Sequence, residues 1–151
     1  MAKLIVIIGT TRNQGGSVAE AFLADKKWRL RIISRTPLKP PHENGPPAAL
    51  LASSLSDPAV RAEAGKRGIS PEERCAEIGI QCGKNLALAA RTPDVQKTLE
   101  RYVYSSLGNH SKLSGGRYIQ TWHCDSKAAV ERYGRDDPVL GPRSSFIRFG
   151  L

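Results

Sequence analysis

The sequence predicts an α/β fold built on a parallel β-sheet, and three features of its first 34 residues carry this prediction. An unbroken aliphatic run at Leu4–Ile8 is typical of a strand buried on both faces of a parallel sheet. A glycine-bearing turn and a helical pattern follow it directly. A second apolar run at Trp28–Ser34 then reads as the next strand. Alternation of strand and helix in this order favours the α/β class.

The turn after the first strand is the predicted phosphate-binding element. Gly9 ends the strand, and the helical pattern opens at Gly15. Unpaired backbone N–H groups and the positive end of a helix favour an anion at such a turn. The glycine spacing is close to a dinucleotide-binding fingerprint, except that Arg12 occupies the middle position. Glycines also form tight strand–helix turns that bind no ligand, so the spacing alone is a weak signal.

The helix that follows is predicted to be amphipathic. Its apolar residues are spaced to line one face, and we expect the inward positions to be Val18, Ala21 and Phe22.

Length and composition indicate one domain spanning residues 1–151, long enough for a moderate core. No apolar run approaches the roughly 20 residues that cross a bilayer, and no signal peptide is recognised. A cytoplasmic or nuclear location without a membrane partner is therefore expected. The formal net charge is +9, but the positive residues are scattered, so direct nucleic-acid binding is not expected. The three cysteines and three histidines lack zinc-ligand spacing, and no metal is expected.

The end of the second strand carries the signal for the type of dinucleotide. At this position an acid binds the ribose hydroxyls of NAD, whereas an arginine can accommodate the 2′-phosphate of NADP. Arg35 follows the strand at once, and no Asp or Glu stands between Lys27 and Pro41. Charge complementarity therefore favours NADP over NAD. The competing interpretation is an ordinary exposed arginine in a turn.

A proline-rich stretch interrupts the pattern after the second strand. Residues 36–47 contain five prolines, which fix φ and remove backbone donors, so an irregular insert is expected at 38–58. Within it, Ala48–Leu55 fits a short strand or a helical turn equally well.

Two helices with N-terminal caps are predicted next. Asp57 precedes Pro58 in the first, which Gly68 ends. Ser70 caps the second, with Glu73 at the capping-box position, and this helix continues to about Arg91. Its expected apolar face contains Ile78, Cys82 and Leu86.

The last third of the chain predicts a strand, a polar loop, a helix and a tail. The strand at Leu99–Leu107 carries Ser105 and Ser106 near its carboxyl end, where ligands bind in parallel sheets. A polar loop at 108–116 leads to a helix at His123–Tyr133, with Ala129, Val130 and Tyr133 expected inward. The tail at 134–151 closes on a final strand at Ser145–Phe149.

Three blocks, residues 3–37, 72–107 and 111–133, resemble the NmrA-like family, atypical relatives of the short-chain dehydrogenases. In the first block, GTTRNQGGSVAEAFL is similar to the family's opening loop, although Arg12 departs from it. The resemblance implies a Rossmann-like NAD(P)-binding fold. The expected cofactor contacts are Gly9, Thr11, Arg12, Asn13, Gln14 and Gly15 in the loop, Arg35 after the second strand, and Lys127 in the last predicted helix.

Two departures from the family pattern predict an incomplete sheet. The family places two further strands between the second strand and the fourth helix, where this chain offers at most Ala48–Leu55. Unless that segment fills the slot, Leu4–Ile8 keeps an unpaired edge. Family members also continue into a smaller lobe over the cleft, and the sequence at hand ends at Leu151 without it.

The region of the active site in enzymatic relatives leaves the activity open. Lys127 stands where the family lysine is expected, but His123 replaces the tyrosine four residues before it. The resemblance then implies a redox-sensing NAD(P)-binding regulator without dehydrogenase activity, acting with a protein such as a transcription factor. Histidine exchanges protons near neutral pH, so an NADPH-dependent reductase similar to isoflavone-reductase-like enzymes is the first alternative. A degenerate fragment without a ligand is the second.

Overall fold

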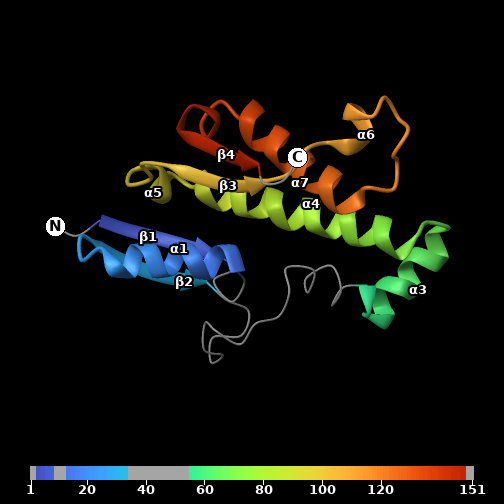
Figure 1. Cartoon of the computed structure of the whole chain (residues 1–151), viewed down its shortest axis with the longest axis horizontal. Helices are drawn as coiled ribbons and strands as arrows, with labels where there is room; N and C mark the ends of the chain where they lie inside the picture. The colour runs from blue at the N-terminus through green and yellow to red at the C-terminus, as the bar shows by residue number, and fades with distance from the viewer. Residues whose placement is uncertain (1–2, 9–12, 34–54, 149–151) are drawn as a thin grey trace. The chain divides into compact units, whose positions relative to one another are not determined.

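The structure, a computed structural model, describes residues 3–8, 13–33 and 55–148 of the chain. It is an α/β protein with parallel strands, as expected (Figure 1). The chain divides into two compact units, Met1–Ser53 and Ser54–Leu151, which are taken in turn. Most of the predicted insert, 38–54, lies outside the described residues, and so does most of the candidate segment Ala48–Leu55.

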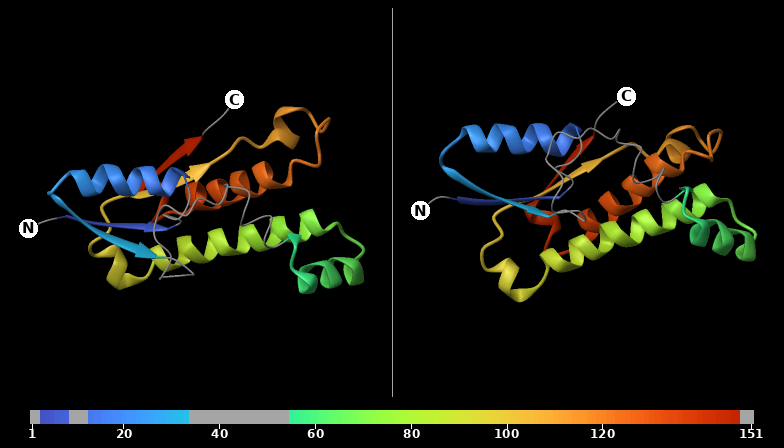
Figure 2. Two further views of the ribbon diagram at one scale, coloured as in Figure 1. Left: turned by 60° about the horizontal axis from the view of Figure 1, so that its bottom comes forward. Right: turned by 90° about the horizontal axis from the view of Figure 1, so that it is seen from below.

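The first unit contains the predicted strand, helix and strand. Strand β1 (Lys3–Ile8), helix α1 (Asn13–Ala24) and strand β2 (Trp28–Ile33) follow one another, and β1 pairs in parallel with β2 (Figure 2). The register runs from Lys3 opposite Trp28 to Ile8 opposite Ile33. A parallel pair requires a crossover, and α1 provides it.

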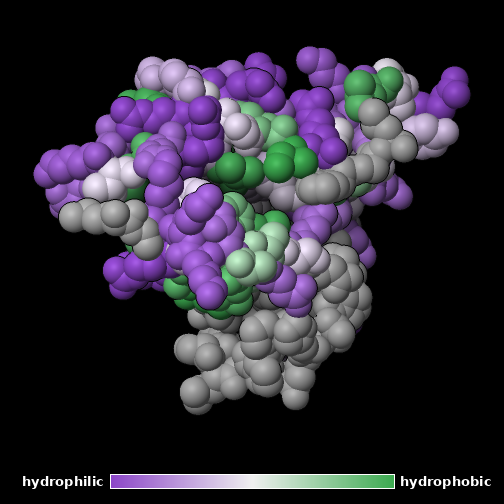
Figure 3. Space-filling view, turned by 60° about the vertical axis from the view of Figure 1, so that its left-hand side comes forward, coloured by the Kyte–Doolittle hydropathy of each residue, from purple (hydrophilic) through white to green (hydrophobic). Residues whose placement is uncertain are grey.

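The expectation that Leu4–Ile8 is buried on both faces is wrong. Ile7 is 8% exposed, whereas Leu4, Val6 and Ile8 are 52%, 46% and 50% exposed. Alternate residues of a strand point to opposite faces, and within this unit only one face of the sheet packs on α1. Exposed apolar side chains of this kind are visible among hydrophilic ones at the surface in Figure 3.

The inward face of α1 differs by one position from the prediction. Ala19 is 4% exposed, and the Phe22 ring packs edge-on against Trp28 with centroids 5.0 Å apart. Val18 is 42% exposed, and Ala21 is also exposed. The small Ala19 therefore lies against the sheet in place of the larger Val18.

The second unit contains five α-helices, one 3₁₀ helix and two parallel strands among its described residues. In chain order these are α3 (Pro58–Arg67), α4 (Pro71–Ala90), α5 (Pro93–Gln96), β3 (Tyr102–Ser106), α6 (His110–Leu113), α7 (Trp122–Asp136), η1 (Gly141–Arg143) and β4 (Ser144–Arg148). Strands β3 and β4 pair from Tyr102 opposite Ser144 to Ser106 opposite Arg148. The expected final strand is thus present; Phe149 lies outside the described residues. The short helix α6 occupies part of the stretch predicted as loop.

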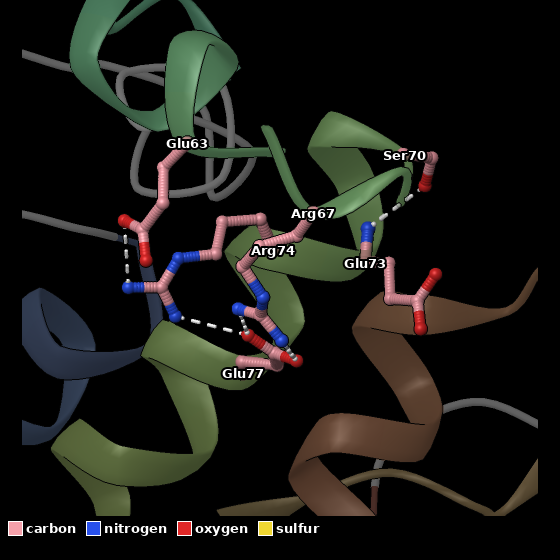
Figure 4. Close-up of polar contacts among 6 residues, drawn as sticks. All are labelled: Glu63, Arg67, Ser70, Glu73, Arg74 and Glu77. Carbon is pink, nitrogen blue, oxygen red and sulfur yellow. Dashed lines mark hydrogen bonds and ion pairs between the residues drawn. The ribbon is translucent and has the colours of Figure 1, made fainter. Parts of the chain in front are cut away.

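The predicted helix caps are confirmed. The Asp57 carboxylate accepts a hydrogen bond from the Ala59 N–H at 2.9 Å, and Gly68 ends α3 in the left-handed region at φ 64°. The Ser70 hydroxyl oxygen accepts from the Glu73 N–H at 3.0 Å at the start of α4 (Figure 4). These bonds span at most a few residues, which is why the sequence alone indicates them.

An ion cluster joins α3 to α4 (Figure 4). Arg67 donates two hydrogen bonds to the Glu77 carboxylate at 2.6 and 2.7 Å. The Arg74 guanidinium lies with Nη1 3.0 Å from Oε2 of Glu77 and with Nη2 3.1 Å from Oε2 of Glu63. The hydrogen bonds from Arg67, and after them those from Arg74, lower the pKa of Glu77 to about 2. These groups are partly exposed, so the cluster orients the two helices more than it stabilises the fold.

Helices α4 and α7 pack closely because a glycine lies at their contact. A β-carbon built on Gly83 would lie 2.5 Å and 2.7 Å from the two γ-carbons of Val130. The buried residues of α4 are Cys75, Ala76, Gly83 and Ala87. The predicted face is therefore wrong at Cys82 and Leu86, which are exposed. Close helix packing buries small side chains, and a pattern of large apolar residues does not indicate them.

We predict that Gly83→Ala destabilises the protein by about 1–3 kcal/mol, because the added methyl overpacks the contact with Val130. Gly79, in the same helix, has open space around it, so Gly79→Ala is expected to stabilise by up to about 1 kcal/mol through helix propensity. Urea unfolding of both variants measures the difference. Equal effects of the two substitutions would show that the helices do not approach closely at Gly83.

Candidate functional site

The described residues hold part of the predicted dinucleotide site. Asn13, Gln14 and Gly15 belong to the first turn of α1, which begins two residues earlier than predicted. Lys127 belongs to α7 in the second unit. The remaining predicted residues, Gly9, Thr11, Arg12 and Arg35, lie outside the described residues.

The first turn of α1 has the electrostatic character that an anion requires. The first four N–H groups of a helix have no partner within the helix, and the peptide dipoles add a partial positive charge there. No acidic residue occurs in this turn. The helix end is therefore not neutralised by a carboxylate of its own first turn, and its chemistry fits a phosphate.

In the second unit, Lys127 lies at the carboxyl end of β3. Its Nζ donates a hydrogen bond to the carbonyl oxygen of Ser105 at 3.2 Å. The hydroxyl of the next strand residue, Ser106, donates to the Lys127 carbonyl oxygen at 3.4 Å. Two consecutive strand residues thus hold the lysine, one through its side chain and one through its backbone.

The expectation that both serines border a cleft is wrong for Ser106, which is 0% exposed. Ser105 is half-buried. Adjacent strand residues point to opposite faces, so Ser106 is directed into the contact with α7.

His123 lies one helical turn before Lys127 on α7. Residues four apart share a helix face, so the side chains of His123 and Lys127 start from neighbouring positions on α7. His123 is exposed, whereas Lys127 is half-buried. The imidazole and the ammonium group therefore come from successive turns of one side of α7.

The start of α7 is fastened to α6 through Asp125. Its carboxylate accepts hydrogen bonds from the N–H of Ser111 at 3.3 Å, from the hydroxyl of Ser111, and from the hydroxyl of Thr121 at 2.9 Å. Burial raises the pKa of Asp125, but these hydrogen bonds outweigh burial and the pKa lies below its usual value. The segment between the two helices is therefore tied to the turn of α7 that carries His123.

Sequence reasoning missed Glu131 and its partners. The Glu131 side chain is 3% exposed, and its carboxylate accepts hydrogen bonds from Arg148 at 2.8 and 3.0 Å and from Arg135 at 2.7 Å. Burial raises the pKa of Glu131, but hydrogen bonds from Arg148 and Arg135 outweigh it and hold the pKa at about 2. The signal in the sequence is the four-residue spacing of Lys127, Glu131 and Arg135, which ordinarily marks a solvated helix face.

The parallel β1–α1–β2 unit and the lysine at the end of β3 define a partial Rossmann-like domain. The sequence model of the NmrA-like family matches residues 1–149, and the chain belongs to this family.

Three relatives illustrate the relationship. An NmrA-like family domain-containing protein of Dictyostelium discoideum is 24% identical over 97% of this chain and 50% of its own length. An NmrA-like family domain-containing oxidoreductase of Malbranchea aurantiaca is 30% identical over 88% of this chain and 43% of its own length. A second such oxidoreductase, from Aspergillus hancockii, is 25% identical over 89% and 42%. The chain spans about half the length of these relatives.

Two further properties concern the described part of the chain. None of its helices is both long and apolar enough to cross a membrane. No group of three His, Cys, Asp or Glu residues within it is arranged to hold a metal ion.

We predict that Glu131 makes the stability of the protein sensitive to acid. Its pKa of about 2 lies below the ordinary value of 4.5, so its contribution is fully present above about pH 5 and is lost as the pH falls toward 2. The gap in free energy of unfolding between wild type and Glu131→Gln should therefore narrow on acidification, by on the order of 3 kcal/mol.

Urea unfolding at several pH values measures this gap. Asp136→Asn is the matched control, because it removes an acid from the same helix that is 67% exposed and 3.5 Å from Arg132. A constant gap for Glu131→Gln from pH 7 to pH 2 would contradict the prediction.

Proposed function

We propose that this chain is an NAD(P)-binding, redox-sensing regulatory protein of NmrA-like type that carries no dehydrogenase activity. Members of this family generally bind NAD(P). The observation that carries the proposal is the β1–α1–β2 unit, in which an acid-free helix start follows a glycine-bearing connection. A dinucleotide pyrophosphate is the anion such a helix start favours.

Each candidate residue has a chemical role in this proposal. Backbone amides of the glycine-bearing segment and of the first turn of α1 hold the pyrophosphate, and the contributing residues are Gly9, Thr11, Arg12, Asn13, Gln14 and Gly15. The Arg35 guanidinium pairs with the 2′-phosphate and selects NADP over NAD. The Lys127 ammonium binds ribose hydroxyls. When bound, the nicotinamide supplies hydride chemistry.

The absence of the catalytic tyrosine supports a regulatory role. With His123 in its place, Lys127 has no phenol whose pKa it can lower. A protein that binds NAD(P) without turning it over can report the redox state of the pool to a partner, such as a transcription factor, in the cytoplasm or nucleus.

A reductase is the second candidate function, because two of the relatives are named oxidoreductases. The alternative would use Lys127 alone, in the manner of isoflavone-reductase-like enzymes. NADPH oxidation with a panel of enones and quinones, abolished by Lys127→Ala, would replace the regulatory proposal with this one. A degenerate fragment that binds no nucleotide is the third candidate.

Calorimetric titration with NADPH and NADH tests the binding proposal. We expect NADPH to bind more tightly than NADH, and Arg35→Gln to weaken NADPH at least 10-fold while leaving NADH unchanged, because only NADPH carries the 2′-phosphate. Arg29→Gln, an exposed arginine of the same unit, is the control. The absence of both binding heat and a thermal shift at millimolar NADPH would contradict the binding proposal.

Arg12 provides a separate prediction, because it stands at a position where the fingerprint has glycine. We expect Arg12→Gly to weaken NADPH binding by about 10-fold, through loss of a charge-assisted contact to phosphate. Titration of the variant measures the change. A large gain in affinity would instead mean that the side chain obstructs the pyrophosphate and that the site is degenerate.

A further inference from the structure

We propose that Glu131 is a positioning residue for Lys127, acting with Arg148 to hold α7 on the carboxyl end of the β3–β4 pair. The assignment of a ligand to Lys127 rests on the proposed function. The positioning itself is a property of the second unit alone, where α7 packs on both strands (Figure 1).

The first step is the link between α7 and the end of β4. Arg148 is the last residue of β4, and its guanidinium donates two hydrogen bonds to Glu131, from Nε at 3.0 Å and from Nη2 at 2.8 Å. Paired bonds of this kind fix both the distance and the orientation of the two groups. Arg135, one turn further along α7, donates to the same carboxylate at 2.7 Å.

The second step is the link between α7 and the end of β3. Ser106 is the last residue of β3 and lies opposite Arg148 in the strand register. Its buried hydroxyl donates a hydrogen bond to the Lys127 carbonyl oxygen at 3.4 Å. The end of β4 is therefore joined to α7 at Glu131, and the end of β3 is joined to α7 at Lys127, one helical turn away.

The third step connects Glu131 to Lys127 along the helix. The two residues are four positions apart, so they share one face and are separated by about 6 Å along the axis. A helix turn is stiff. Rotation or sliding of α7 at Glu131 is accordingly transmitted to Lys127, whose Nζ then leaves the Ser105 carbonyl oxygen that it meets at 3.2 Å.

The remaining anchorage of α7 lies elsewhere. Val130 packs on Gly83 of α4, and a β-carbon built on Gly134 would lie 3.4 Å from the Phe146 ring of β4; neither contact includes Glu131. The Arg135 and Arg148 side chains are 58% and 60% exposed, so both guanidiniums reach water if the carboxylate is removed. We therefore expect variants of this cluster to keep their fold while losing the placement of α7 on the strand ends.

The experiment compares Glu131→Gln and Arg148→Gln with the control Asp136→Asn, on the full chain and well below each melting temperature. The first readout needs no nucleotide: the Cε–Hε NMR signal of Lys127, assigned by its loss in Lys127→Arg. We expect both cluster variants to move this signal toward that of solvated lysines, and the control to leave it in place. The second readout is NADPH affinity, expected to fall at least 10-fold in the cluster variants alone.

An unmoved Lys127 signal in the folded cluster variants would overturn the proposal, and so would unchanged NADPH affinity in a variant whose signal has moved. If Glu131→Gln fails to fold, Arg148→Gln decides the matter, because it removes a partly exposed partner and leaves the acid in place. If wild type binds no NADPH, the proposed function fails, and the NMR arm still decides the positioning.

Discussion

The contact of α7 with α4 constrains the rest of the second unit. Gly83 brings the two helix backbones close, and Val130 fills the space that a side chain at Gly83 would occupy. One turn further along the same side of α7, a β-carbon built on Gly134 would lie 3.4 Å from the Phe146 ring of β4. These two small-residue contacts set how closely α7 approaches α4 and β4. Glu131, next to Val130 in the chain, is buried beside these contacts and is paired with Arg148 and Arg135.

Local features of this fold were predictable from the sequence because they depend on few residues. The Asp57 and Ser70 caps satisfy N–H groups two or three residues away, and the aliphatic run at β1 needs only its own backbone to be extended. The faces of α1 and α4 were predicted one position off. Ala19 and Ala87 are buried where Val18 and Leu86 were expected, since close packing selects small residues that hydrophobicity patterns underweight.

The same distinction between local and long-range features applies to the candidate site. Lys127 was found because a helix position and a family motif coincide, and the structure places its ammonium on the end of β3. Glu131 was missed because its partner Arg148 is 17 residues away and belongs to a stretch predicted as tail. An ion pair between residues far apart in the chain produces no periodic pattern in the sequence. The row of charged residues on α7 looks solvated until β4 is known to lie against it.

The energetics of Glu131 bear on its role. Removing the Glu131 carboxylate from water carries a desolvation cost that often equals the attraction to its two arginines, so an apolar side chain of similar volume would stabilise this contact at least as well. Apolar side chains would not fix one rotation of α7, because dispersion contacts allow a helix to slide. The paired hydrogen bonds from Arg148 do not allow such sliding. The ion cluster is thus better suited to setting orientation than to adding stability. The residue whose position most depends on that orientation is Lys127, one turn away on the same face.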